Sequence, residues 1–294
     1  MRNQDIARLI ILAAIWGGSY ALMRIVAPAL SGMGTAWIRM ILGGLLLCGY
    51  ALILGTDLGM RRWWKQYLFI GALSSAIPFS LIGYAMKTLP ATYGSVLNAL
   101  SPLFGALFSA ALLGEHLSGR KLAGIALGFM GVGILVRLGP VDVTTDLLLG
   151  AAACVLATAS YGYFAVHTKK HLGGAPNMGL ATGTLFFPAL PLTIFAVPSL
   201  PSSWPSTTVL VATAVLAVVC SGVAYVIYFR LIRDVGPSRA ISVTFLIPVF
   251  GSIWGVLFFG ETVDLTSVLG TLTILAGMAL VLGRAPGRKA AGAA

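Results

Sequence analysis

Apolar residues run along this chain in long stretches that short polar segments separate. Windows long enough to cross a bilayer fall near residues 8–27, 34–54, 67–86, 92–113, 121–138, 147–167, 178–197, 208–229, 238–259 and 267–283. We therefore expect an all-α integral membrane protein with ten transmembrane helices. The connecting loops are too short to hold a soluble domain.

A motif of proline, glycine and glutamate occurs twice, 146 positions apart. It reads Pro-x-Phe-Gly, eight residues, then Gly-Glu, and runs from Pro102 to Glu115 and again from Pro248 to Glu261. An internal repeat in an apolar chain is typical of transporters built from two related halves. We predict a first five-helix repeat, a second five-helix repeat and a cytoplasmic tail, in residues 1–140, 141–284 and 285–294.

Five spans per half is an odd number, so the two halves insert in opposite orientations. Inverted repeats place a binding site near mid-membrane between the halves and give two states, open to opposite sides. The sequence therefore predicts alternating access through a central cavity.

Charge and composition agree with a membrane protein. The chain is 58% hydrophobic and only 9% charged, whereas soluble proteins carry roughly 25% charged residues. With both termini placed inside, 15 of the 19 cations lie on the cytoplasmic side, and the other four are Arg24, Arg39, Lys87 and Arg137. The net charge of +11 then follows the positive-inside rule and indicates no nucleic-acid partner. We predict a multi-pass protein of the bacterial inner membrane with both termini cytoplasmic.

Polar and aromatic side chains at mid-depth are the candidates for substrate binding. Hydroxyl and amide groups there suit ammonium and carboxylate groups, and aromatic rings suit an apolar side chain. Asn98 must find hydrogen-bond partners in hydrocarbon, either by joining helices or by lining a cavity. The predicted substrate-binding residues are Trp16, Tyr20, Tyr84, Asn98, Ser101, Tyr161, Phe164, Tyr225 and Thr244.

Other side chains are candidates for conformational roles. Pro78, Pro102 and Pro248 lie inside spans, where proline removes a backbone hydrogen bond and kinks the helix, so we interpret them as hinges or as static bends. Glu115 and Glu261 end their helices against the macrodipole and are predicted to form a gate or latch. For Arg39, inside the second span, we expect interior pairing or a bond to backbone carbonyls. The alternative is that Arg39, with Arg24 and Lys87, draws a substrate carboxylate toward the outer mouth.

Acidic residues and catalytic motifs are missing from the predicted spans. All eight acidic residues lie near membrane edges, which slightly favours downhill export over proton coupling. The sequence has no buried acid pair, no His-x-x-x-His and no Gly-x-Ser-x-Gly motif, so an enzyme of the membrane interior is a distant alternative. We expect neither a metal nor a cofactor.

The ten spans, the five-plus-five duplication and the repeated motif together resemble the drug/metabolite transporter superfamily, specifically its EamA family. Trp16-Gly17 in the first span and Leu89-Pro90-Ala91 before the fourth are similar to that family as well. Within the family the chain looks most like YddG-type exporters of aromatic amino acids. The resemblance implies a cavity lined by spans one, three, four, six, eight and nine.

The leading interpretation is an exporter of aromatic or other neutral amino acids, working as a monomer or weak dimer in the lipid bilayer. Export of other metabolites or drugs, such as nucleoside-like or amphipathic compounds, is the alternative on the same fold.

Overall fold

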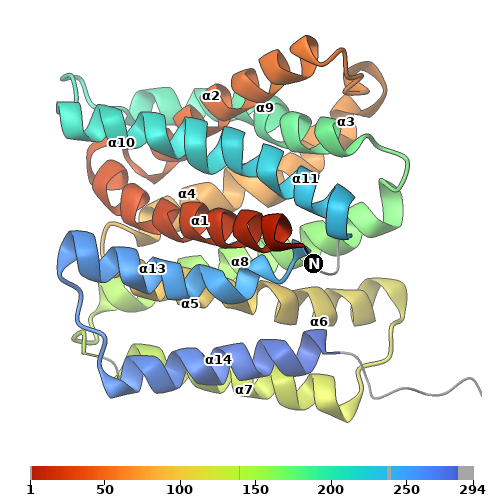
Figure 1. Cartoon of the computed structure of the whole chain (residues 1–294). Helices are drawn as coiled ribbons and strands as arrows, with labels where there is room; N and C mark the ends of the chain where they lie inside the picture. Colours follow the sequence, from red (N-terminus) through yellow and green to blue (C-terminus); the bar gives the residue numbers. More distant parts are fainter. Residues whose placement is uncertain (1, 139, 237–239, 284–294) are drawn as a thin grey trace, which may run out of the picture.

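The computed structural model describes residues 2–138, 140–236 and 240–283, and every regular element within these ranges is helical (Figure 1). Seven spans are single helices: α1 (Asn3–Leu30), α2 (Gly32–Ile53), α7 (Gly119–Leu138), α8 (Thr145–His171), α9 (Asn177–Ala196), α13 (Val243–Phe259) and α14 (Leu265–Leu282).

The other three spans are interrupted helices. They comprise α3 (Met60–Gly71), η1 (Ala72–Ala76) and α4 (Ile77–Ala85); α5 (Ala91–Leu97), η2 (Asn98–Leu100) and α6 (Ser101–Leu113); and α10 (Thr207–Ala217), η4 (Val218–Val223) and α11 (Ala224–Val235). A short 3₁₀ turn, η3 (Val197–Ser199), follows α9. Within the described residues, nine spans are long and apolar enough to cross a membrane, and α13 is a shorter apolar helix. The predicted ten-helix fold is confirmed.

The two halves interlock through their first and fourth spans. Gly17 of α1 packs on α13 so closely that an added Cβ would lie 2.8 Å from the Gly251 nitrogen. Its counterpart Gly162 of α8 packs on α6 in the same way, with the corresponding distance to the Gly105 nitrogen 2.7 Å. The first helix of each half therefore packs against the other half, and Figure 1 shows α1 beside α13.

The fifth and tenth spans, α7 and α14, form a pair held by glycines. A Cβ on Gly124 would lie 2.7 Å from the Gly277 carbonyl oxygen, and a Cβ on Gly270 would lie 3.2 Å from the Gly131 carbonyl oxygen. Gly124 and Gly131 match Gly270 and Gly277 at the repeat spacing, so the two contacts are symmetry mates. Small residues at these positions let the backbones approach closely.

Local irregularities also repeat between the halves. The π-helical segments η1 and η4 begin at Ala72 and Val218, 146 positions apart. At the ends of α6 and α13, Gly114 and Gly260 adopt left-handed conformations, with φ of 67° and 62°. These values favour glycine, which explains why glycine precedes each glutamate of the motif.

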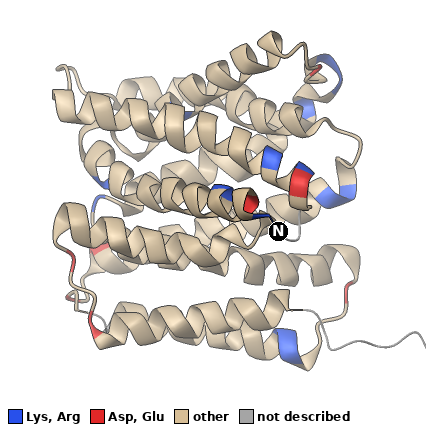
Figure 2. Cartoon of the chain, in the orientation of Figure 1, with Lys and Arg blue, Asp and Glu red and all other residues tan. Residues whose placement is uncertain are grey.

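Charged residues lie mainly at the two ends of the helix bundle (Figure 2). At one end, which we call the basic end, the start of α1 meets the end of α11 through an ion pair of 2.7 Å between Arg8 and Asp234. The opposite end holds the α1–α2, α4–α5 and α13–α14 connections. Arg239, Arg284, Arg288, Lys289, the predicted tail and the side chain of Arg137 lie outside the described residues.

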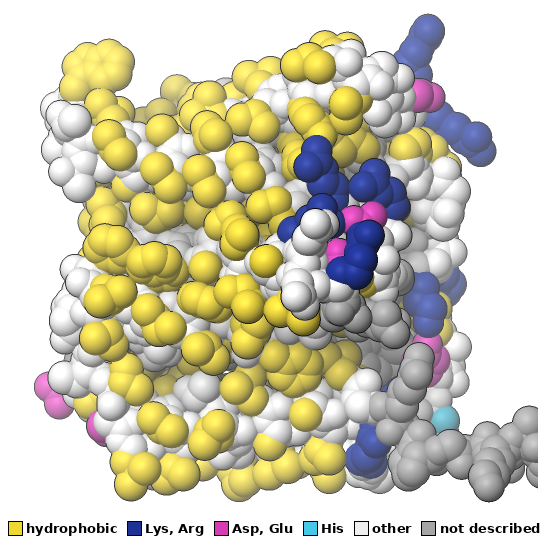
Figure 3. Space-filling view, in the orientation of Figure 1, with side chains coloured by type: hydrophobic (Ala, Val, Ile, Leu, Met, Phe, Trp, Pro, Cys, Tyr) yellow, Lys and Arg dark blue, Asp and Glu magenta, His cyan; other side chains and the backbone are white. Residues whose placement is uncertain are grey.

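Hydrophobic side chains cover most of the outer surface between these ends, as Figure 3 shows for one face. On α13, for example, Leu257 is 68% exposed and Phe258 is 65% exposed. Such an apolar girdle requires lipid rather than water around it.

Candidate substrate cavity

A cavity of about 540 Å³ lies between the two halves. Its lining comes from α1, α2, the third and fourth spans, α8, α11 and α13, and extends to α7 and α14. It reaches from the buried Met23 and Arg39 to Lys121 and Lys169, whose side chains are 30% and 68% exposed at the basic end. The cavity therefore opens toward the basic end, and its volume suits a ligand the size of an amino acid.

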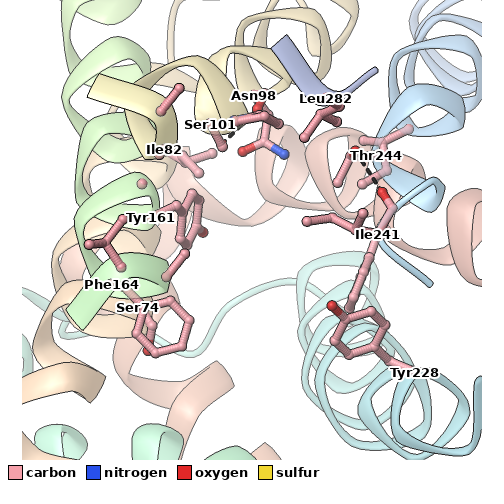
Figure 4. A pocket seen from close by; sticks show the side chains of 18 of the residues that line it. Ser74, Ile82, Asn98, Ser101, Tyr161, Phe164, Tyr228, Ile241, Thr244 and Leu282 are labelled. Carbon is pink, nitrogen blue, oxygen red and sulfur yellow. Dashed lines mark hydrogen bonds between the residues drawn. The ribbon is translucent and has the colours of Figure 1, made fainter. Parts of the chain in front are cut away.

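Aromatic rings line this cavity on more than one side. The ring of Trp16 lies 5.2 Å from that of Tyr228 and 6.2 Å from that of Tyr225, the latter edge-to-face. Tyr161, at the position of the second half that matches Trp16, also lines the cavity. Figure 4 shows Tyr161 and Tyr228 on opposite sides of the open space. Such rings offer an apolar surface together with hydroxyl groups.

Polar groups from the two fourth spans face the same space. Asn98 and Thr244, which are 146 positions apart, both line the cavity (Figure 4). The Asn98 side-chain oxygen has no hydrogen-bond partner, whereas the Thr244 hydroxyl donates to the Ile241 carbonyl at 2.8 Å. The Asn98 oxygen is buried within the lining, so it is an unsatisfied acceptor that is not exposed to the cavity.

Of the predicted substrate-binding residues, eight line the cavity: Trp16, Tyr20, Asn98, Ser101, Tyr161, Phe164, Tyr225 and Thr244. The exception is Tyr84, which is 46% exposed on α4 and does not line it. Its position five residues beyond Phe79, which does line the cavity, puts it on a different face of the helix. We remove Tyr84 from the candidate site.

Phe79 and Ile82 are among the lining residues that the prediction missed, and both are ordinary apolar side chains. Phe79 and Ile82 line the cavity from α4, and composition gives no reason to select them in so apolar a span. The repeat register does give one, because adding 146 to each number leads to Tyr225 and Tyr228 of α11.

Glu261 closes the opposite end. Its carboxylate forms an ion pair with Arg24 and accepts hydrogen bonds from the backbone N–H groups of Ala91, at 2.7 Å, and Thr92, at 3.0 Å. Its side chain is 7% exposed. Gly255 leaves the room in which this carboxylate lies, since a Cβ there would collide with it. One side chain thus joins the ends of α13 and α1 to the start of α5.

Glu115 lies at the basic end, where its partners among the described residues are two lysines. Lys169 donates to its carboxylate at 2.9 Å, and the Lys121 ammonium lies 3.9 Å away. The Lys169 hydrogen bond lowers the pKa of Glu115 below its ordinary value of 4.5, and the two nearby positive charges act in the same direction. The Glu115 side chain is 38% exposed. Lys169 matches Arg24 at a spacing of 145, so the two pairs are counterparts.

The three prolines occupy different backbone settings. Pro78 follows the π-helical segment η1, and Pro102 follows the 3₁₀ turn η2, whereas Pro248 lies within α13. Proline at 102 cannot donate to the Asn98 carbonyl four residues earlier, and the Ser101 hydroxyl donates to that carbonyl instead, at 2.8 Å. The helical hydrogen-bond ladder is therefore open beside Asn98.

Arg39 lies at the closed end of the cavity. Its side chain is interior, as expected, but its described partners are not backbone carbonyls. Its Nε donates to the Ser221 hydroxyl at 2.8 Å, its Nη1 lies 3.8 Å from the Met23 sulfur, and its guanidinium stands 4.0 Å from the centre of the Phe79 ring.

The described residues contain no group of three or more His, Cys, Asp or Glu side chains that would hold a metal ion.

Comparison with known families gives a match along nearly the whole chain. The profile of the EamA-like transporter family matches residues 6–137 and 148–283, which is one match in each half. Among individual relatives, the chain is 26% identical to the uncharacterized transporter YvbV of Bacillus subtilis, over 96% of this chain and 93% of that protein. It is 28% identical to the uncharacterized inner membrane transporter YedA of Escherichia coli, over 93% and 89% of the two chains.

Solved structures contain the same fold. One crystal structure superimposes with a TM-score of 0.66 and 18% sequence identity, covering 95% of this chain and 96% of that one.

Proposed function

The chain belongs to the EamA-like transporter family, and from this membership we propose that it exports small metabolites, with aromatic and other neutral amino acids as its cargo. The observation that carries the proposal is the cavity between the halves, which is closed at one end, open at the other and walled by aromatic rings and polar groups. An enzymatic role has no comparable support in the site.

The charge distribution supports an orientation. We propose that the basic end faces the cytoplasm, because the positive-inside rule places lysine and arginine clusters there. Both termini are then cytoplasmic, and the inner-membrane relative YedA supports a bacterial inner membrane. In this orientation the cavity of the structure opens inward.

The side chains that line the cavity support amino acids as the transported molecules. Trp16, Tyr161 and Tyr225 present ring surface to an apolar or aromatic side chain, and Asn98 adds an amide group to the same lining. Phe164, Ser101 and Thr244 complete the candidate site. No carboxylate lines the cavity among the described residues, which favours downhill export over proton coupling.

The matched ion pairs support alternating access. We propose that the Arg24–Glu261 latch opens as the Lys169–Glu115 side closes, so that the cavity faces one side of the membrane at a time. The repeat boundary near residue 140 then separates two halves, 1–140 and 141–284, that move against each other. One chain contains the whole cavity, so we propose a monomer as the transport unit.

The experiment is efflux from liposomes containing the purified protein and preloaded with labelled tryptophan, phenylalanine, threonine or glutamate, with and without a pH gradient. We expect efflux of the neutral and aromatic amino acids, unaffected by the gradient. Asn98→Ala should reduce this efflux without loss of folded protein, whereas Tyr84→Ala, outside the cavity, should not. Efflux that requires the gradient would contradict the uncoupled mechanism. Absence of amino-acid efflux would contradict the cargo and favour other metabolites or drugs.

A further inference from the structure

The buried guanidinium of Arg39 has no role in the transport proposed above. Its side chain is 5% exposed, about two turns along α2 from the start of that helix, and it lines the cavity. Two of its N–H groups have partners, the Ser221 hydroxyl and the Met23 sulfur, and both partners are neutral. Arginine has five such donors in a rigid fork, so donors remain for a ligand.

A buried charge of this kind needs compensation. An ionised group inside a membrane protein is costly unless it is paired, and arginine stays protonated in proteins. The Phe79 ring face supplies a partial attraction. No ion pair joins Arg39 to any Asp or Glu of the described residues, and none of those acids lines the cavity. The contents of the cavity must therefore provide the negative charge.

The cavity leads an anion toward this position. Lys121 and Lys169 line its mouth, although Glu115 neutralises part of their charge. Deeper inside, Tyr20, Tyr161 and Tyr225 line the same cavity as Arg39. A carboxylate at this depth would meet a fork of N–H donors beside several O–H donors.

The second half of the chain has no cation at the position that matches Arg39. The position that matches Arg39 is Thr184, whose hydroxyl donates to the Leu180 carbonyl of its own helix at 2.6 Å. The charge therefore has one location in the cavity, whereas Trp16 has the aromatic counterpart Tyr161 and Asn98 the polar counterpart Thr244. A single anionic group on the ligand satisfies this arrangement.

We propose that Arg39 binds the carboxylate of the transported molecule, so that the site selects small aromatic or apolar carboxylates and rejects amines that lack a carboxylate. This inference rests on the proposed transport through the same cavity. It names the group that every substrate must carry. The tyrosine hydroxyls tolerate an ammonium group without requiring one, because they are neutral acceptors.

The test compares ligands that share an aromatic body. Binding of phenylalanine, 3-phenylpropionate, phenylalaninamide and phenethylamine to the purified full chain in detergent is measured by calorimetry. We expect the two carboxylates to bind about tenfold to a hundredfold more tightly than the amide and the amine, since a charge-assisted hydrogen bond contributes about 1.5–3 kcal/mol. Arg39→Gln should abolish this difference, and Arg39→Lys should retain part of it.

The control is Lys87→Gln, which removes an exposed cation that does not line the cavity, and it should leave the difference unchanged. The selectivity ratio separates ligand binding from a folding defect, because misfolding lowers binding of all four ligands together. Equal binding of phenylalanine and phenylalaninamide to the wild type would overturn the inference and leave amino-acid-like export intact. Binding of 3-phenylpropionate without phenylalanine would support the inference and contradict the amino-acid cargo. Failure of both carboxylates to bind would overturn it.

Discussion

Glu115 and Glu261 occupy matched positions in the two repeats but differ in how firmly they are held. Glu261 is nearly buried and has three partners, of which two are backbone N–H groups. Glu115 is partly exposed and has two lysines near it. One neighbour differs, because the residue six positions before Glu261 is Gly255 and the residue six positions before Glu115 is Ser109. A side chain in place of Gly255 would collide with the Glu261 carboxylate.

This difference gives a paired prediction for stability. Glu261→Gln should lower the free energy of unfolding by about 2 kcal/mol, because it weakens hydrogen bonds to a buried charge. Glu115→Gln should lower it by less than about 1 kcal/mol, as for other exposed ion pairs. Thermal unfolding of the two variants in detergent measures both effects. Equal losses would show that Glu261 does not hold the closed end as described.

The pH dependence of the Glu115 contact has a defined sign. The folded protein lowers the pKa of Glu115, so this contact contributes stability that is fully present above the ordinary value of 4.5 and is lost as pH falls through the lowered pKa. The difference in thermal midpoint between wild type and Glu115→Gln should therefore be constant at neutral and mildly acidic pH and vanish only below 4.5. In a Lys169→Gln background, where the main cause of the shift is gone, the loss should occur at higher pH.

At the scale of elements, each half contains helices whose hydrogen-bond ladder is interrupted beside the cavity. The π-helical segments η1 and η4 share one register position, and Ser74 of η1 lines the cavity. The Ser160 hydroxyl of α8 donates to the Leu73 carbonyl in η1 at 2.6 Å. In the other half the corresponding elements are joined in the reverse direction, because the Cys220 thiol of η4 donates to the Ile15 carbonyl of α1 at 3.4 Å. Such π-helical turns often occur at functional sites.

The interrupted helical hydrogen bonding at Pro102 predicts that a substitution there changes the transport rate. Pro102→Ala restores an N–H that can bond to the Asn98 carbonyl and so stiffens the fourth span. If the break is a moving hinge, turnover in the liposome assay should fall about tenfold, equivalent to about 1.4 kcal/mol in the barrier, while substrate affinity changes little. Pro191→Ala is the control, because Pro191 is exposed on α9 and has no proline at its repeat position. Unchanged turnover in Pro102→Ala would make the proline a static bend.

At the scale of the whole molecule, the span positions and the duplication could be predicted because apolar length and repeat spacing are properties of the sequence alone. The motif also predicted that Glu115 and Glu261 end their helices. The side of a span that faces the cavity was harder to predict, because a membrane helix is apolar all round and gives little periodic signal. Tyr84 was misplaced for this reason. The Arg39 partners and the looser hold on Glu115 depend on contacts between helices far apart in the chain.

The unequal hold on the two glutamates also has a consequence for the direction of traffic. For a carrier that works as proposed, the firmer bonds of Glu261 make the state with its opposite end shut the more populated one when no cargo is bound. Without cargo, the binding site is then accessible mainly from the basic end, and cargo binds from that side. Saturation should accordingly need less cargo on that side of the membrane than on the other, although an uncoupled carrier still moves cargo only down its concentration gradient.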